Sequence, residues 1–277
     1  MKTVEIVSKL NKMYDDYYCK DQGYCKYFEE CRKGRKKVFA PQFYSDRVKV
    51  GAEYGIDSPR IVFVGLEGVH ADGTLQIPEI DINDEWSRPS LVETNNHYRG
   101  VRYVLSYLMC GILGKDKPEN ATVKALDGDQ VYLNKYCLTN IFKCAFGEGR
   151  SGLPHTKSMQ EHCPELFKKE MEILRPDILV IQVVTNRPSF LSIEKMKENF
   201  GKRDVQNVAT VPRNPNTAAY KLYFDDGKSF YCIWTYHGNG GPYTQKEGGV
   251  FVNNSKYITE ELNPVLDEVI KRYRNES

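Results

Sequence analysis

The stretch "RIVFVGLEGVHADG", residues 60–73, places an acid and a histidine on a glycine-rich turn directly after a short apolar run. The run at 61–64 is continuous rather than alternating, which is typical of a strand buried on both faces of a parallel sheet. Three further apolar runs follow along the chain, at 136–142 (YCLTNIF), 178–184 (ILVIQVV) and 230–236 (FYCIWTY). The stretch therefore predicts the first strand of a buried sheet, with Glu67 and His70 on its turn.

Helical patterns separate these runs. Residues 97–114 and 158–175 carry apolar residues at helical spacing, and Pro176 predicts the end of the second helix. Strands alternating with helices predict an α/β fold with a parallel sheet covered on both faces. Ligands on such sheets bind beyond the carboxyl ends of the strands. The candidate loops are therefore 65–73, 140–146, 185–190 and 237–244.

The 277 residues show no repeat or low-complexity segment, and we treat residues 1–277 as a single domain. Residues 1–58 precede the first strand and open with an amphipathic helix, whose apolar face holds Val4, Ile6, Val7, Leu10 and Met13. Residues 72–96 and 238–257 are expected to be inserted loops, the second long and glycine-rich. The segment 258–274 predicts a closing amphipathic helix.

Composition is typical of a soluble globular protein, with 40% hydrophobic and 27% charged residues. No apolar run approaches the roughly 18 residues that span a bilayer, and the N-terminus has no secretory pattern. We therefore expect a cytoplasmic protein with no membrane partner. The net charge of +2 neither demands nor excludes a polyanionic partner, and the basic run "RKGRKK" at 32–37 is either a phosphate contact or a solvated surface.

Eight cysteines without an export signal argue against a disulfide framework. Cys110, Cys137 and Cys232 lie in apolar segments and are interpreted as core residues. The other five are Cys19, Cys25, Cys31, Cys144 and Cys163. Thiolates from separate segments are suited to a metal cluster or a zinc ion, although no C-x2-C spacing is present. Reduced, unconnected thiols are the alternative interpretation.

Taken together, these segments resemble the uracil-DNA glycosylase superfamily, and especially its iron–sulfur branch. "PRIVFVGLEGVH" resembles the first catalytic motif, "HYRGVRYVLSYL" the segment with an aromatic residue before a helix, and "LTNIFKC" the strand that ends in Thr-Asn. "CPELFKKEMEILRPDILVIQ" resembles the helix and strand that carry the last cluster cysteine, and "TYHGNGG" the second catalytic motif. The order and spacing of these segments carry the resemblance more than any one motif.

The resemblance implies a three-layer α/β/α sandwich with a central four-stranded parallel sheet. It also implies a structural [4Fe–4S] cluster held by Cys25, Cys31, Cys144 and Cys163, with Cys19 as the rival of Cys25. The implied activity is that of a DNA glycosylase, most simply for uracil, acting as a monomer on double- or single-stranded DNA. Such an enzyme flips the nucleotide out of the stack and hydrolyses its N-glycosidic bond, which leaves an abasic site.

The implied site follows residue by residue. Glu67, His237 and His70 are the catalytic candidates, for the sugar cation and the departing base. Asn140 would read the base edge, and Tyr98 would stack on the base beside Gly65 and Leu66. Gly238 and Asn239 would contact DNA after His237. Each also has a purely structural interpretation, as a turn former, a helix N-terminal acid or a core aromatic residue.

The chain departs from the family pattern at three places. Gly68 stands where the family has proline, Gly238 and Asn239 stand where it has Pro-Ser, and the iron–sulfur branch usually has its acid at the position of Leu66. Small residues make room, so a second interpretation is a glycosylase for a bulkier modified base, such as a modified cytosine in defence against viruses. A third is a nucleic-acid-binding protein that kept the fold and lost catalysis. A fourth is a zinc-stabilised domain with an unrelated role.

Overall fold

The computed structural model describes most of the chain. The described residues are 2–17, 25–33, 43–45, 48–67, 96–119, 132–142, 144–146, 157–182, 191–200, 205–236, 244–247, 250–253 and 255–276.

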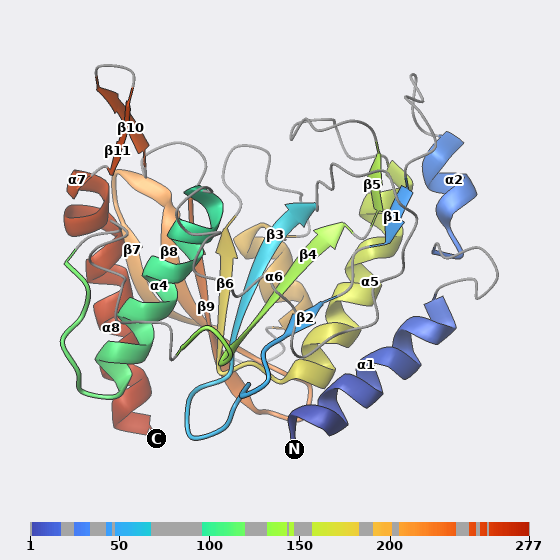
Figure 1. Ribbon diagram of the computed structural model, residues 1–277, viewed down its shortest axis with the longest axis horizontal. Helices are drawn as coiled ribbons and strands as arrows, with labels where there is room; N and C mark the ends of the chain where they lie inside the picture. The colour runs from blue at the N-terminus through green and yellow to red at the C-terminus, as the bar shows by residue number, and fades with distance from the viewer. Residues whose placement is uncertain are drawn as a thin grey trace.

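A seven-stranded sheet forms the centre of the fold, in the order β2-β4-β3-β6-β9-β8-β7 (Figure 1). Its strands are β2 (Lys49–Val50), β3 (Ile61–Glu67), β4 (Tyr136–Phe142), β6 (Ile178–Gln182), β7 (Gln206–Val211), β8 (Asn214–Tyr223) and β9 (Ser229–Thr235). The four apolar runs of the sequence are β3, β4, β6 and β9, which confirms the prediction of an α/β protein.

These four strands are neighbours and run parallel to one another. The expected sheet of four strands was nevertheless too small, because β2 adds to one edge and β8 and β7 add to the other, all antiparallel. The missed strands are shorter or more polar than the central ones. β7, for example, has exposed or half-buried residues at five of its six positions, so it carries no continuous apolar run.

Helices cover both faces of the sheet (Figure 1). They are α1 (Thr3–Tyr17), α2 (Phe28–Lys33), α4 (Asn96–Ile112), α5 (Lys157–Leu174), α6 (Ile193–Phe200), α7 (Ser255–Tyr257), the π-helical turn η6 (Ile258–Leu262) and α8 (Asn263–Glu276). The helices predicted at 97–114 and 158–175 are thereby confirmed, and the helix predicted at 258–274 is divided into the π-helical turn η6 and α8.

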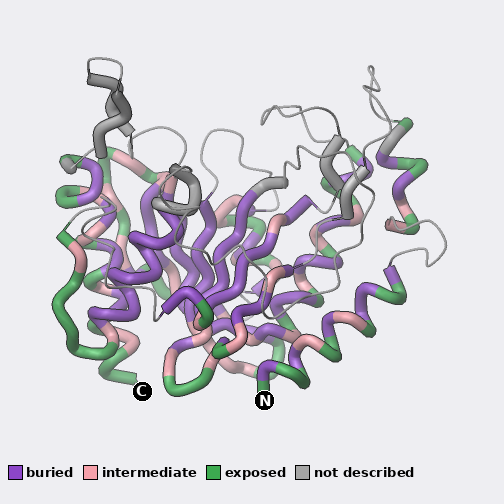
Figure 2. The backbone as a smooth tube through the Cα atoms, viewed as in Figure 1, coloured by how far each residue is buried: buried purple, intermediate pink, exposed green. Residues whose placement is uncertain are grey.

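The central strands are buried (Figure 2), and alternate residues of each strand enter two separate apolar cores. Val62 and Val64 pack with α1, α5 and α6, on what we call the α5 face of the sheet. Ile61 and Phe63 pack with α4 and α8, on the α4 face. Because both faces are covered, both sets of side chains are apolar, which explains the continuous runs in the sequence.

The N-terminal helix is amphipathic as predicted, with one correction. Ile6, Leu10 and Met13 are buried, and Val7 packs against the same core. Val4 is 69% exposed and does not belong to the buried face. Its position, two residues before Ile6, turns it about 200° away from Ile6 around the helix.

Two small antiparallel ladders replace segments that the sequence predicted as loops. β1 (Phe43–Ser45) pairs with β5 (Cys144–Phe146), so the expected loop 140–146 contains the end of one strand and a second strand. β10 (Thr244–Glu247) pairs with β11 (Val250–Asn253) inside the expected loop 238–257. Both ladders were missed because their segments lack the apolar periodicity of a core strand.

A buried carboxylate ties α1, α5 and β4 together on the α5 face. Glu170 is fully buried and accepts hydrogen bonds from the Tyr14 hydroxyl and from Thr139 Oγ1, the latter at 3.0 Å. Tyr14 in turn accepts a bond from the backbone N–H of Val48 at 2.9 Å. These hydrogen bonds offset the large free-energy cost of burying the Glu170 side chain.

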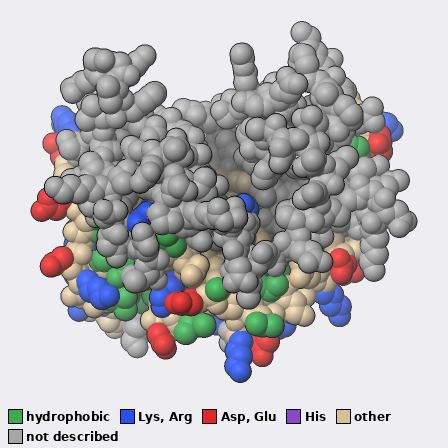
Figure 3. Space-filling model, in the orientation of Figure 1, with side chains coloured by type: hydrophobic (Ala, Val, Ile, Leu, Met, Phe, Trp, Pro, Cys, Tyr) green, Lys and Arg blue, Asp and Glu red, His purple; other side chains and the backbone are tan. Residues whose placement is uncertain are grey.

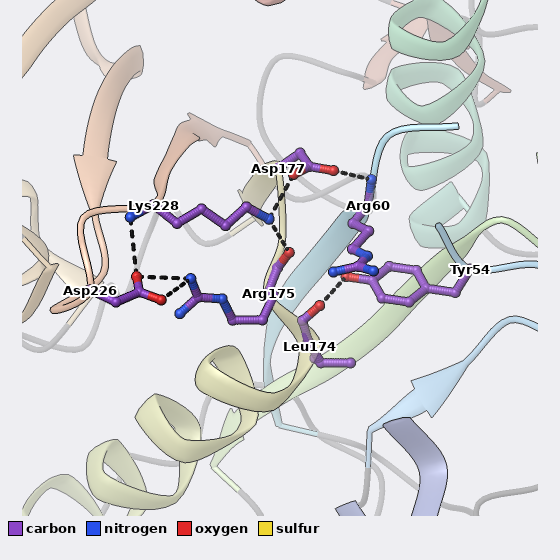
Figure 4. Close-up of polar contacts among 7 residues, drawn as sticks. All are labelled: Tyr54, Arg60, Leu174, Arg175, Asp177, Asp226 and Lys228. Carbon is purple, nitrogen blue, oxygen red and sulfur yellow. Dashed lines mark hydrogen bonds and ion pairs between the residues drawn. The ribbon is translucent and has the colours of Figure 1, made fainter. Parts of the chain in front are cut away.

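The amino ends of the parallel strands are joined by a second polar network (Figure 4). Asp177, just before β6, accepts a bond from the backbone N–H of Arg60 at 2.8 Å and pairs with Lys228 Nζ at 2.8 Å. Arg175 Nη2 donates hydrogen bonds of 2.9 and 2.7 Å to the two carboxylate oxygens of Asp226. The guanidinium holds the pKa of that carboxyl below its usual range. Every contact in this network serves to align strands, so we assign it to stability.

Replacing Asp177 by Ala is expected to lower the free energy of unfolding by about 1–3 kcal/mol, because it removes a charged acceptor from a partly buried N–H and an ammonium. Chemical denaturation monitored by circular dichroism measures the change. Asp226→Ala is the matched control, since the Asp226 carboxylate is exposed and its ion pair with Arg175 contributes little. A loss in Asp177→Ala no larger than that in Asp226→Ala would contradict the stabilising role of Asp177.

Candidate functional site

The four parallel strands all end at one edge of the sheet, the upper edge in Figure 1. The chain leaves β3 to form β4 on one side, and then crosses back to form β6 on the other side of β3. The strand order therefore reverses between β3 and β6. In open α/β sheets, ligands bind outside the carboxyl ends of the strands at such a switch point.

One residue from each parallel strand lies at this edge on the α4 face. They form a row across the sheet, consisting of Asn140 on β4, Gly65 on β3, Gln182 on β6 and Thr235 on β9. Each is two residues beyond a core residue of the α4 face: Leu138, Phe63, Val180 and Ile233. Because residues two apart on a strand lie on the same face of the sheet, these four residues continue the α4 face beyond its apolar core. Three of them have polar side chains, and the fourth is glycine.

The gap at Gly65 is filled by its neighbour. Gly65 pairs with Asn140 in the ladder, and Asn140 Oδ1 lies 2.3 Å from where a Cβ on Gly65 would stand. No side chain fits at that distance, so only glycine lets the Asn140 amide lean across β3. The sequence prediction that Gly65 and Asn140 share a site is consistent with this contact.

The other end of the row is anchored by Tyr257, whose hydroxyl lies 3.0 Å from Thr235 Oγ1 and 3.1 Å from Thr217 Oγ1. The backbone N–H of Tyr236 donates to the same hydroxyl at 3.4 Å, and the Tyr236 hydroxyl donates to Asn214 Oδ1 at 3.2 Å. Burial raises the pKa of Tyr257, so it stays a neutral hydrogen-bonding group. These bonds hold the chain in place directly before His237.

The remaining candidates fall at the same edge or outside the described residues. Leu66 and Glu67 are the last two residues of β3, and Glu67 pairs with Phe142 across the ladder. Tyr98 lies in the first turn of α4. His70, His237, Gly238 and Asn239 lie outside the described residues, as do residues 72–95 of the first expected insertion.

Sequence reasoning missed Gln182. It is 1% exposed at the end of β6, and among the described residues nothing lies within hydrogen-bonding distance of its amide oxygen or nitrogen. A signal was present, because "ILVIQ" ends a fully apolar run with an amide. The run is typical of a core strand, and the sequence prediction gave no separate role to the glutamine at its end.

Three of the proposed cluster ligands come together at one corner of the α5 face. Cys31 and Cys163 are buried in the same apolar core, and Cys25 packs against it. Cys31 Sγ lies 3.4 Å from Ser158 Oγ, near the start of α5. The fourth candidate, Cys144, begins β5 on the same side of the molecule in Figure 1, and Cys19 lies outside the described residues.

Aromatic and charged contacts hold this corner together. The rings of Tyr27 and His162 stack with centroids 3.7 Å apart, and His162 Nε2 lies 3.4 Å from Glu30 Oε2. Both contacts join the segment that carries Cys25 and Cys31 to the residue before Cys163. The backbone N–H of Tyr27 also donates to Cys25 Sγ at 3.5 Å, a type of bond that stabilises a thiolate.

Sulfur spacing bears on which metal group this corner suits. Zinc held by thiolates would place neighbouring sulfurs about 3.8 Å apart. Among the described side chains, the group of potential ligands within 4.8 Å of one another is Glu30, Glu161 and His162, with no cysteine. Two of these three are exposed acids, which commonly occur without an ion. The described thiols therefore do not form a compact zinc site.

The three cysteines interpreted as core residues are buried as predicted. Cys110 is 5% exposed, and Cys137 and Cys232 are fully buried. Burial raises the pKa of the Cys137 thiol, which keeps it protonated and unreactive.

The described part of the surface in Figure 3 carries charges of both signs. Over the described part of the face in Figure 3, acidic and basic side chains are interspersed and do not gather into a patch of one sign. Of the basic run at 32–37, Arg32 and Lys33 end α2, and residues 34–37 lie outside the described part of the chain. No helix in the described residues is long and apolar enough to cross a membrane.

Comparison with protein-family models finds no family that matches this chain, and comparison with curated proteins finds no matching relative. At the switch point, the Asn140 amide leans over Gly65 and the buried amide of Gln182 lies on the next strand. Glu67 is the last residue of β3. Amides bind neutral polar ligands, and an acid nearby can stabilise a cation or orient water.

Proposed function

We propose that the protein is a DNA glycosylase that flips a base, most simply uracil, out of the stack and hydrolyses its N-glycosidic bond. The observation that carries the proposal is the contact between Gly65 and Asn140 at the switch point of the sheet. The resemblance of the sequence to the uracil-DNA glycosylase superfamily points to the same two residues. Four neighbouring parallel strands with helices on both faces suit the three-layer sandwich of that superfamily.

The chemistry assigns a role to each group at the edge. The Asn140 amide would bond to the edge of the flipped base and stabilise the negative charge that grows on it as the bond breaks. Glu67, at the end of β3, would stabilise the oxocarbenium-like sugar and orient the attacking water. Tyr98 would stack on the base, and His237 would lie beside the base carbonyl. Gly238 and Asn239 would contact the DNA gap, and the enzyme would act as a monomer inside the cell.

The test is excision from synthetic DNA. Single-stranded and duplex oligonucleotides carry uracil, hydroxymethylated cytosine or glucosylated cytosine at one position, and alkali reveals abasic sites as strand breaks. Breaks at uracil support the leading proposal. Breaks only at a modified cytosine would favour the enzyme for a bulkier base, which the small residues at Gly68 and Gly238 make room for.

We further propose a [4Fe–4S] cluster at the cysteine corner, with Cys25, Cys31, Cys144 and Cys163 as ligands. The shared core of the three described thiols and the N–H bond to Cys25 support this proposal. The stacked rings of Tyr27 and His162 also join the segment of Cys25 and Cys31 to the residue before Cys163. The cluster would join α2, α5 and β5, so its role here is structural.

Protein purified without oxygen is expected to be brown, to absorb broadly in the visible range and to contain iron and sulfide. Cys163→Ser is expected to lose most of the iron and the colour, because it removes a thiolate ligand from the start of α5. Cys232→Ser is the matched control, since that thiol is buried in a central strand. A colourless wild-type protein that contains stoichiometric zinc would contradict the cluster.

A further inference from the structure

The buried amide of Gln182 is an exception that calls for a physical reason. The large majority of buried side-chain polar atoms in proteins have a hydrogen-bond partner, because an unsatisfied group loses its bonds to water without replacement. Gln182 is 1% exposed, and within the described part of the chain both its amide oxygen and its amide nitrogen lack a partner. A polar group left unsatisfied at the functional edge of a sheet is typical of a binding residue whose partner is the ligand.

The neighbours of Gln182 in the row explain why it stays unsatisfied. Thr235 pairs with Gln182 in the ladder, but its hydroxyl is engaged by Tyr257 at 3.0 Å. On the other side, the ladder that pairs Val64 with Ile181 brings Gly65 alongside Gln182, and glycine offers no side chain. The strand pairing therefore gives the Gln182 amide no hydrogen-bonding side chain from β3 or β9.

Asn140 borders Gly65 from the opposite side. Its Oδ1 lies over Gly65, so it has moved from its own strand toward β6. Adjacent strands are about 4.8 Å apart, which places the two carboxamides close enough to contact one small ligand together. Within the described row, only Gly65 stands between the two residues, and the Asn140 amide reaches over it toward Gln182.

We propose that Gln182 is a specificity-determining residue that reads the base together with Asn140. The proposal rests on the glycosylase function and names the chemistry that its pocket selects. Two carboxamides supply two N–H donors and a carbonyl acceptor to one edge. That set matches a neutral imide, in which two carbonyls flank a ring N–H, as in uracil. Each carbonyl of the base accepts a hydrogen bond from one side-chain N–H, and the ring N–H of the base donates to Asn140 Oδ1.

The substitution that tests this role is Gln182→Met, which keeps the length of the side chain and removes both polar atoms. Removing a ligand-reading amide is expected to weaken uracil binding and slow uracil excision by about 10- to 100-fold. The melting temperature is expected to stay the same or to rise, because an unsatisfied amide leaves the core. A purely structural glutamine would give the reverse pattern, with a lower melting temperature and binding that is unaltered.

Two control variants separate the amide from general disturbance of the sheet. Gln206→Met makes the same chemical change on the exposed strand β7 and is expected to change neither binding nor stability. Ile181→Val trims the neighbouring residue, which faces the α5 core, and is expected to lower stability without altering the preference for uracil. Each variant is measured by thermal melting and by excision from a uracil oligonucleotide.

Direct binding is followed by NMR on ¹⁵N-labelled protein with free uracil and with 3-methyluracil, which lacks the ring N–H. The side-chain NH2 signals of Gln182 are those that vanish in the Met variant, and uracil is expected to shift them more than 3-methyluracil. Shifts without any excision would sustain the binding role and reject the glycosylase. Excision that is unchanged in Gln182→Met, or NH2 signals that do not respond to uracil, would overturn the role of Gln182.

Discussion

Glu67→Gln is expected to reduce base excision by about 10²- to 10⁴-fold, the range that general acid–base and charge-stabilising groups contribute. The substitution preserves the shape of the side chain and removes its negative charge, which is the property that a sugar cation requires. Glu67 is the last residue of β3, directly beside the switch point of the sheet. The measurement is a single-turnover rate on a uracil duplex, which isolates the chemical step from product release.

The control for this prediction is Glu53→Gln, the same chemical change at an exposed acid beside Lys135, near the amino end of β4. We expect it to leave the excision rate unchanged. Binding of the Glu67→Gln protein to a uracil duplex should remain near that of the wild type, because the charge acts on the transition state. Full activity in Glu67→Gln would remove Glu67 from the mechanism and favour a protein that binds DNA without cleaving it.

Gly65→Ala is expected to lower excision by about 10²- to 10³-fold, the loss seen when one group that stabilises a developing anion is displaced. An alanine Cβ would stand 2.3 Å from Asn140 Oδ1, so the amide has to move. The atom in the way is the far end of a side chain, and its movement costs the fold little. We therefore expect a change of less than about 1 kcal/mol in the free energy of unfolding.

A double-mutant cycle shows whether Gly65 acts through Asn140. Asn140→Ala removes the amide, and with the amide gone a methyl group at position 65 has nothing left to displace. The double variant is therefore expected to be no slower than Asn140→Ala alone, since the two residues act as one unit. Additive losses would mean that Gly65 contributes in some other way, for example through its own backbone.

How far the sequence predicts this fold depends on how each segment is buried. The central strands and long helices carry strong apolar patterns, because both faces of the sheet are covered. The edge strands have no such pattern. β8 and β7 alternate exposed, half-buried and buried residues. β8 is held by pairing with β9 and β7 by pairing with β8, which is a property of tertiary structure. Residue propensity and apolar periodicity do not predict this pairing, because it depends on the neighbouring strand.

The site was predicted in the same uneven way. Gly65 stood out because it ends the apolar run at 61–64, and Asn140 because "LTNIFKC" resembles the family strand that ends in Thr-Asn. The ladder brings the two into register. Gln182 carried a similar signal but needed the strand order, since only the crossing from β4 back to β6 places it beside β3. The polar network at the opposite edge, around Asp177 and Lys228, depends on a hairpin that the sequence did not indicate.

The product that the wild-type protein releases from a uracil-containing duplex decides whether the protein is a glycosylase. Mass spectrometry of the reaction is expected to detect free uracil and an intact strand that carries one abasic site, both absent with Glu67→Gln. That result would establish the reaction and place it at the end of β3. A folded wild-type protein that releases no base from uracil or modified-cytosine duplexes would contradict the account.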